Sequence, residues 1–203
     1  MSLYSRYVLP HLIDLAMRQE RVREQRARLV PRAHGSVLEV GIGSGLNLPY
    51  YDASRVRRLC AVDPSAELLA MARRNARLRR AEIELVCQSA ERLPFADASF
   101  DSVVMTWTLC SIPDPAAALR EIRRVLKSGG ELLFIEHGLS RDAGVAAWQR
   151  RLTPLWRPLA GGCHLDRRID ALIEAVFPGT VPETFYLEGP RILTYMYQGS
   201  ARA

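Results

Sequence analysis

Five short apolar runs follow one another through the middle of the chain, each bounded by glycine, proline or charged residues. Apolar runs of about four to eight residues between turn residues are typical of buried strands. The pattern predicts strands at residues 36–40, 58–62, 83–87, 100–106 and 131–136. Two later runs, 184–187 and 193–198, are predicted to form an antiparallel hairpin at the edge of the same sheet.

Between these runs the apolar residues return every three or four positions, as they do along one face of a helix. Pro10 and Pro115 suit a first helical turn, and Ser65, Asp114 and Asp166 suit helix N-caps. The pattern predicts helices at residues 10–30, 66–80, 114–128, 145–155 and 166–177, the third of them closed by the glycines at 129 and 130.

Strands and helices therefore alternate from about residue 36 to residue 136. This order predicts an α/β fold with a doubly wound, Rossmann-like sheet of seven strands, mostly parallel with an antiparallel C-terminal hairpin. A length of 203 residues fits a single domain overall. Within it we distinguish an N-terminal helical cap, residues 1–34, from the main α/β domain, residues 35–203.

Composition narrows the class of protein further. Hydrophobic residues make up 48% of the chain and charged residues 25%, which is typical of a globular protein and not of a disordered or membrane-spanning one. The first residues lack the apolar core of a secretory signal. The cysteines, Cys60, Cys87, Cys110 and Cys163, lie far apart without a CxxC pair, so we expect no disulfide framework and no metal site. We expect a cytoplasmic location.

The net charge of +6 comes almost entirely from arginine, much of it within residues 18–32. Glu20 and Glu24 are interleaved with these arginines. One interpretation is a solvated helix face with ion pairs, and the other is a contact surface for acidic lipid or nucleic acid. Mixed signs weaken a long-range field, which favours the solvated face.

A glycine-rich loop, Gly41-Ile42-Gly43-Ser44-Gly45, directly follows the first predicted strand. Ligands of doubly wound sheets bind beyond the carboxyl ends of the strands, which is where this loop lies. Its spacing departs from the dinucleotide pattern GxGxxG, because the third glycine falls at Gly45 and Leu46 takes the expected place. No P-loop pattern is present. A simple glycine turn in another α/β protein is the remaining alternative.

Two acidic residues flank this loop. Glu39 precedes it, and a carboxylate there suits a ligand that carries an ammonium and a sulfonium better than it suits a pyrophosphate. Asp63 ends the second predicted strand, about 20 residues downstream, where an acidic residue commonly binds ribose hydroxyls. Together the loop and the two carboxylates indicate a sulfonium cofactor.

On these residues the sequence resembles the class I S-adenosylmethionine-dependent methyltransferases. The stretches that carry the resemblance are 39–45, 62–65, 89–95, 100–104 and 119–130. The resemblance implies S-adenosylmethionine as the cofactor. It also implies that the methionine end is surrounded by Gly41, Gly43 and Gly45, with Glu39 near the ammonium. Asp63 is expected to hold the ribose, beside Pro64 and Ser65. Ala90 and Glu91 are expected to flank the adenine, and Thr106 to lie near the methyl group.

A closer resemblance is to the alkyl thiol methyltransferases of animals and their bacterial relatives. Residues 106–111, 134–137 and 148–167 carry it. It implies a thiol as one candidate acceptor. The animal enzymes also carry an N-terminal hydrophobic anchor, and we expect none in this chain.

The acceptor side is less defined by the sequence. His137, directly after the fifth strand, is the candidate general base, with a structural histidine as the equal alternative. Trp107, Tyr7, Trp148 and His164 are candidates for the acceptor pocket, and ordinary packing is the alternative for each aromatic. Cys110 is interpreted as a small buried filler.

The sequence thus predicts a methyltransferase that uses S-adenosylmethionine and acts on a small-molecule acceptor. Two alternatives stay open: a phospholipid (phosphatidylethanolamine) N-methyltransferase with peripheral membrane contact, and a cofactor-binding protein without catalysis. No nucleic-acid partner is expected, because no recognition domain or base-flipping signature is present. The sequence predicts no particular oligomeric state.

Overall fold

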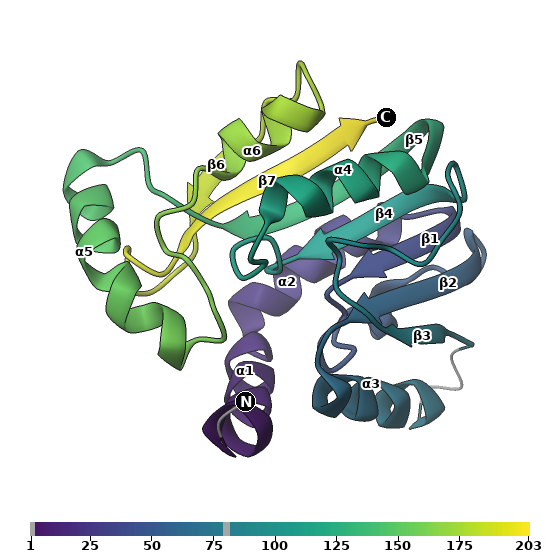
Figure 1. Ribbon diagram of the computed structural model, residues 1–203, viewed down its shortest axis with the longest axis horizontal. Coiled ribbons are helices and arrows are strands. Elements are labelled where there is room, and N and C mark those ends of the chain that lie inside the picture. Colours follow the sequence, from purple (N-terminus) through teal and green to yellow (C-terminus); the bar gives the residue numbers. More distant parts are fainter. Residues whose placement is uncertain (1–2, 79–81) are drawn as a thin grey trace.

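A computed structural model of the chain describes residues 3–78 and 82–203. Its centre is a seven-stranded sheet in the order β3-β2-β1-β4-β5-β7-β6 (Figure 1). The strands β1 to β5 run parallel, and β7 pairs antiparallel with both β5 and β6. The predicted fold class is confirmed. The strand bounds are β1 Gly35–Val40, β2 Val56–Asp63, β3 Glu84–Cys87, β4 Phe100–Thr106, β5 Leu126–His137, β6 Glu183–Tyr186 and β7 Tyr195–Arg202.

Helices cover both faces of this sheet. On one face α4 and α6 pack against alternate strand residues such as Val103 and Met105, and on the other face α2 and α3 pack against residues such as Val104. Burial on both faces explains the continuous apolar runs of the strands. The helices are η1 Tyr4–Val8, α1 Leu9–Met17, α2 Glu20–Leu29, η2 Val30–Arg32, η3 Leu48–Tyr50, α3 Ala66–Leu78, α4 Pro115–Val125, α5 Ala143–Leu159 and α6 Ile169–Val176.

The carboxyl ends of the parallel strands are covered by two further helical segments. In Figure 1, α1 and α5 lie beyond these strand ends and beside neither sheet face. The Tyr4 hydroxyl donates a hydrogen bond to the carbonyl oxygen of Leu159, at 2.8 Å, which joins the first turn of the chain to the end of α5. The N-terminal segment therefore helps to enclose the edge of the sheet where ligands bind in this architecture.

The single helix predicted over residues 10–30 is wrong, because the chain breaks between α1 and α2. Gln19 is extended, with ψ of 145°. The carbonyl of Met17 accepts a hydrogen bond from Arg26 Nη1 at 2.7 Å. A side chain thus satisfies a carbonyl at the end of α1, and the helix can stop there without an unpaired acceptor.

Other predicted bounds need smaller corrections. Helix α4 ends at Val125 and not at the glycines that follow, because Leu126 already pairs with Phe100 of β4. Helix α6 begins at Ile169, and Arg168, not Asp166, occupies its N-cap position. The last two residues of the helix predicted at 66–80 lie outside the described residues.

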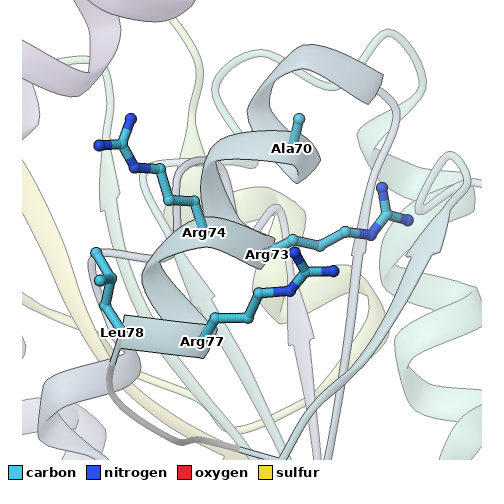
Figure 2. A pocket seen from close by; sticks show the side chains of 5 residues that line it. All are labelled: Ala70, Arg73, Arg74, Arg77 and Leu78. Atoms are coloured by element: carbon cyan, nitrogen blue, oxygen red, sulfur yellow. The ribbon is translucent and has the colours of Figure 1, made fainter.

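Helix α3 carries part of the arginine charge on a face that points to solvent. Leu69, Ala72 and Ala76 are buried against the sheet. Figure 2 shows Arg73, Arg74 and Arg77 projecting from the helix around a shallow depression. All three are exposed, as expected for the solvated face of an amphipathic helix.

Candidate active site

A cavity of about 560 Å³ opens at the carboxyl ends of the parallel strands. One part of the cavity is lined by the glycine loop after β1, the end of β2, the turn after β3 and the segment after β4. The other part is lined by the end of β5 and by residues of α5 and β7. Residues of α1 and α2 close it from the N-terminal side. Because the sheet order is β2-β1-β4-β5-β7, these two parts lie next to each other across β4.

The glycine loop is held to the end of β2 through Asp63. Its Oδ2 accepts the backbone N–H of Gly43 at 2.9 Å, and its Oδ1 accepts that of Ser65 at 2.9 Å. Burial raises the pKa of Asp63, while these two backbone hydrogen bonds oppose the rise. Each carboxylate oxygen keeps a free lone pair, so the group can also accept from a ligand.

The three loop glycines serve different purposes, although all have positive φ. A Cβ atom at Gly41 would clash with Thr108, and one at Gly45 would approach Leu48 at 2.9 Å. At Gly43 nothing lies within 4 Å, so its missing side chain leaves open space. Gly43 is therefore the position where a ligand can approach the backbone most closely.

Glu39 lies behind the loop and not on the cavity wall. Its carboxylate accepts hydrogen bonds from Asn47 Nδ2 at 2.8 Å and from the Tyr51 hydroxyl at 2.9 Å. Asn47 Nδ2 also donates to Thr106 Oγ1 at 3.0 Å. Burial raises the pKa of Glu39 to about 7, although both hydrogen bonds lower it. Glu39 thus orients Asn47 and Thr106, which do line the cavity.

This burial makes stability depend on pH. The pKa of Glu39 is about 7 in the folded chain and near 4.5 when exposed, so the folded state binds more protons between these values. Wild-type stability should therefore fall by about 3 kcal/mol from pH 4.5 to pH 7 through this group alone. We expect Glu39→Gln to remove that loss, because an amide keeps the shape without the buried charge.

Urea unfolding of wild type and Glu39→Gln at about pH 5 and about pH 8 measures this difference. The exposed Glu20→Gln variant is the control, and its curves should follow those of the wild type. If the free energy of unfolding changed equally with pH in the wild type and in Glu39→Gln, that result would contradict a buried charge at Glu39.

Arg26 connects the N-terminal helices with this network. It is only 4% exposed, and burial lowers its pKa to about 10. Its Nε donates to Asn47 Oδ1 at 2.9 Å, and its guanidinium lies 4.9 Å from the ring centroid of Trp107. Trp107 itself has φ of +52°, a conformation that bulky non-glycine residues rarely adopt.

A second acidic residue faces the cavity from α1. Asp14 Oδ1 accepts a hydrogen bond from the Ser44 hydroxyl at 2.5 Å, and Asp14 also pairs with Arg18 at 2.7 Å. Burial alone would raise the pKa of Asp14, but the hydrogen bonds from Arg18 and Ser44 outweigh it and lower the pKa. An acidic side chain that is paired with Arg18 therefore lies beside the glycine loop.

The other part of the cavity is apolar and rich in sulfur. Cys110, Cys163 and Met196 line it together with His137 and Trp156. His137 is 5% exposed, and its Nε2 has no hydrogen-bond partner. Met196 lies opposite His137 in the pairing of β5 with β7.

The structure brings most of the predicted site residues together. The predicted residues that line the cavity are Gly41, Gly43, Asp63, Pro64, Ser65, Ala90, Thr106, Trp107 and His137. Those that lie outside its lining are Glu39, Gly45, Glu91, Tyr7, Trp148 and His164.

The residues outside the lining have contacts of their own. Glu91 accepts the backbone N–H of Asp114 at 2.6 Å and the Ser89 hydroxyl at 2.8 Å. Tyr7 and Trp148 are more than half exposed. His164 Nδ1 faces Asp166 at 3.7 Å, and burial lowers the pKa of this imidazole.

Comparisons with known proteins identify the family. Residues 38–134 match the family described as a methyltransferase domain. The chain is 36% identical over 154 residues to a phosphatidylethanolamine N-methyltransferase of Cereibacter sphaeroides, with 74% of this chain and 73% of that protein covered. This chain belongs to the S-adenosylmethionine-dependent methyltransferases.

Other relatives of this methyltransferase differ in length and in named substrate. A thiol S-methyltransferase, TMT1B of Rattus norvegicus, is 37% identical over 137 residues, covering 65% of this chain and 55% of that protein. The chain thus spans about half the length of this relative. Among the described residues, no helix has both the length and the apolar character needed to cross a membrane.

Solved structures agree with this methyltransferase in fold. YcgJ of Bacillus subtilis superimposes with a TM-score of 0.67 at 23% identity, covering 80% of this chain and 70% of that one. NodS, an N-methyltransferase of Bradyrhizobium japonicum, superimposes with a TM-score of 0.67 at 18% identity, covering 91% of this chain and 88% of that one.

The cofactor of this methyltransferase is S-adenosylmethionine. The cavity fits it. Open space at Gly43 admits a ligand against the backbone, and the carboxylates of Asp14 and Asp63 offer acceptors to its ammonium and hydroxyl groups. Sequence reasoning missed Asp14, Asn47 and Arg26, since no motif singles out one polar residue of α1 or α2 or the asparagine that follows the glycine loop.

Proposed function

We propose that this methyltransferase transfers a methyl group to the sulfur atom of a small-molecule thiol. The observation that carries the proposal is the chemistry of the cavity beyond Thr106. Sulfur and aromatic side chains line that part, and among the described lining residues the only carboxylates, Asp14 and Asp63, belong to the glycine-loop side. The 37% identity to a thiol S-methyltransferase supports the same acceptor.

An amine acceptor needs a different environment. Amines of pKa about 10.4 are protonated at neutral pH, and a cavity for them normally provides a carboxylate to hold the ammonium and take its proton. A thiol ionises with a pKa of about 8.5 and needs no such partner. The carboxylate-poor acceptor side therefore favours a thiol over an amine.

The cofactor side distributes its tasks among a few residues. We infer that Gly41 and Gly43 border the methionine end, that Asp14 contacts the ammonium, and that Asp63 accepts from the ribose hydroxyls. Pro64, Ser65 and Ala90 shape the adenosine wall. Glu39 acts indirectly through Asn47, which donates to Glu39 at 2.8 Å and to Thr106 at 3.0 Å.

When bound, S-adenosylmethionine supplies a methyl group on a positively charged sulfur that leaves as a neutral thioether. The protein's own task is to align the acceptor and to exclude water. Residues of α1 and α5 enclose the cavity for this purpose, and Trp107 borders the region that the acceptor enters. The assignment of His137 as a general base stays a prediction.

A matched pair of acceptors tests the proposal. At pH 7 about 3% of a thiol of pKa 8.5 is ionised, whereas about 0.04% of an amine of pKa 10.4 is neutral. We expect the purified protein to methylate a small cysteine-like thiol of pKa about 8.5 about a hundredfold faster than a small amine of pKa about 10.4. Formation of S-adenosylhomocysteine with each acceptor measures this ratio, and a faster amine would overturn the proposal.

A phospholipid amine is the second candidate, because one feature of the surface favours it. Apolar side chains are exposed on η1 and α1, at Tyr7, Val8, Leu12 and Leu15, and just before η1 at Leu3. Other residues of α1 line the cavity. The relative from Cereibacter sphaeroides is named for phosphatidylethanolamine. Flotation with vesicles that contain phosphatidylethanolamine and anionic lipid, together with transfer of labelled methyl groups to the lipid, distinguishes this candidate from a thiol acceptor.

A further inference from the structure

Three metal-ligating side chains meet at the acceptor side of the cavity, although they are far apart in sequence. Cys110 follows β4, His137 ends β5, and Cys163 lies between α5 and α6. The two sulfur atoms and an imidazole nitrogen all lie within 4.8 Å of one another. Cys163 Sγ is 3.9 Å from His137 Nδ1.

The backbone around these residues fixes their positions. The N–H of His164 donates to the carbonyl of Cys110 at 2.9 Å, and the Arg167 guanidinium donates to the carbonyl of Leu109. Gly161 and Gly162 have positive φ, and the turn they form at the end of α5 presents Cys163. The segment that carries Cys163 is therefore attached directly to the segment that carries Cys110.

Burial also separates this cluster from an incidental group of surface residues. Cys110 is 4% exposed and His137 5% exposed, and all three side chains line the cavity. His137 Nδ1 faces Cys163 Sγ, and among the described residues no group hydrogen-bonds the buried Nε2 of the same ring. An unpaired buried ring nitrogen is costly, at about 1–3 kcal/mol, and usually indicates a water, a ligand or an ion nearby.

We propose that Cys110, His137 and Cys163 bind a zinc ion whose fourth coordination position faces the cavity. Two thiolates and one imidazole form a donor set known from catalytic zinc sites with an open position. Tetrahedral zinc, with bonds of about 2.3 Å to sulfur and about 2.0 Å to nitrogen, separates its donor atoms by about 3.5–3.8 Å. The distance of 3.9 Å from Cys163 Sγ to His137 Nδ1 is already close to this, and the other pairs, within 4.8 Å, need to contract by up to about 1 Å.

The open position is where the acceptor thiol binds, and this part of the inference rests on the proposed function. On coordination the thiol loses its proton to solvent and its sulfur takes the place of a zinc-bound water. The sulfur then forms a bond to the methyl carbon while the bond from that carbon to the sulfonium sulfur breaks, which leaves a methyl thioether and S-adenosylhomocysteine. His137 serves here as a ligand instead of as the predicted base.

Zinc content and affinity of the full chain test the site without reference to activity. We expect about one zinc ion per reduced chain, and we expect Cys163→Ser to weaken zinc affinity, measured by competition with a chromophoric chelator, by about a hundredfold or more. Cys87→Ser is the matched control, since Cys87 is exposed and outside the cluster. Unchanged binding of S-adenosylhomocysteine shows that each variant is folded.

Cobalt substitution gives a second readout. Bound cobalt(II) should show thiolate charge-transfer absorption in the wild type and in Cys87→Ser, and this absorption should decrease in Cys163→Ser. Absence of zinc from reduced wild type, or equal affinity in Cys163→Ser, would overturn the site. Zinc binding without thiol methylation would instead overturn the proposed function, and methylation by zinc-free protein would overturn the role of the metal.

Discussion

Replacing Asp63 by alanine is expected to weaken the binding of S-adenosylhomocysteine by about a hundredfold or more. Two effects add. The variant lacks the carboxylate that we propose accepts from the ribose hydroxyls, and charge-assisted hydrogen bonds of this kind contribute about 1.5–3 kcal/mol each. The glycine loop would also lose its attachment at Gly43 N, so the cradle would be less ordered before binding. Calorimetric titration measures the change, and about 2.7 kcal/mol corresponds to a hundredfold.

Two further variants separate these effects. Asp63→Asn keeps one carbonyl oxygen of similar position and should lose less affinity than the alanine variant. Asp97→Ala is the control, because Asp97 is an exposed carboxylate whose partner is Arg124 at 2.7 Å. If Asp63→Ala and Asp97→Ala bound S-adenosylhomocysteine with equal affinity, the result would show that the cofactor does not lie against β2.

The sequence predicted the centre of the sheet well because β1, β4 and β5 are buried on both faces. Residues 100–106 were expected as a strand and form β4 with the same bounds. A strand covered on both faces is apolar along its whole length whichever elements cover it, so it can be recognised from its own residues alone. The position of Asp63 beside the glycine loop was also predictable, since both end parallel strands that are adjacent in the sheet.

Other features depend on contacts between distant segments and have no local signal. The break after Met17 exists because Arg26 reaches back to its carbonyl. Cysteines at 110 and 163 carry no CxxC spacing, yet the turn at Gly161 and Gly162 joins their segments. One clue was available: Cys110 and His137 both follow parallel strands, whose carboxyl ends share one edge of the sheet.

Arg26→Ala should destabilise the protein by about 3 kcal/mol, because it leaves buried partners without a donor. Asn47 Oδ1 and the carbonyl of Met17 both lose a charge-assisted hydrogen bond. The buried carboxyl of Glu39 also loses a nearby positive charge. For a domain of this size the change lowers Tm by about 6–12 °C. Thermal unfolding followed by circular dichroism measures it.

Arg23→Ala is the matched control on the same helix. The Arg23 side chain is 57% exposed, and its one ion pair among the described residues is with Glu20. Its removal should therefore lower the free energy of unfolding by less than about 0.5 kcal/mol. The double variant Arg26→Ala/Asn47→Ala should be clearly less destabilised than the sum of the single variants, because each removes the same hydrogen bond. Additive effects would mean that Arg26 stabilises the N-terminal helices independently of the cavity. A shortfall from additivity would instead show that the helices of the first 34 residues and the cofactor side share one network, in which Asn47 joins Arg26 to Glu39 and Thr106.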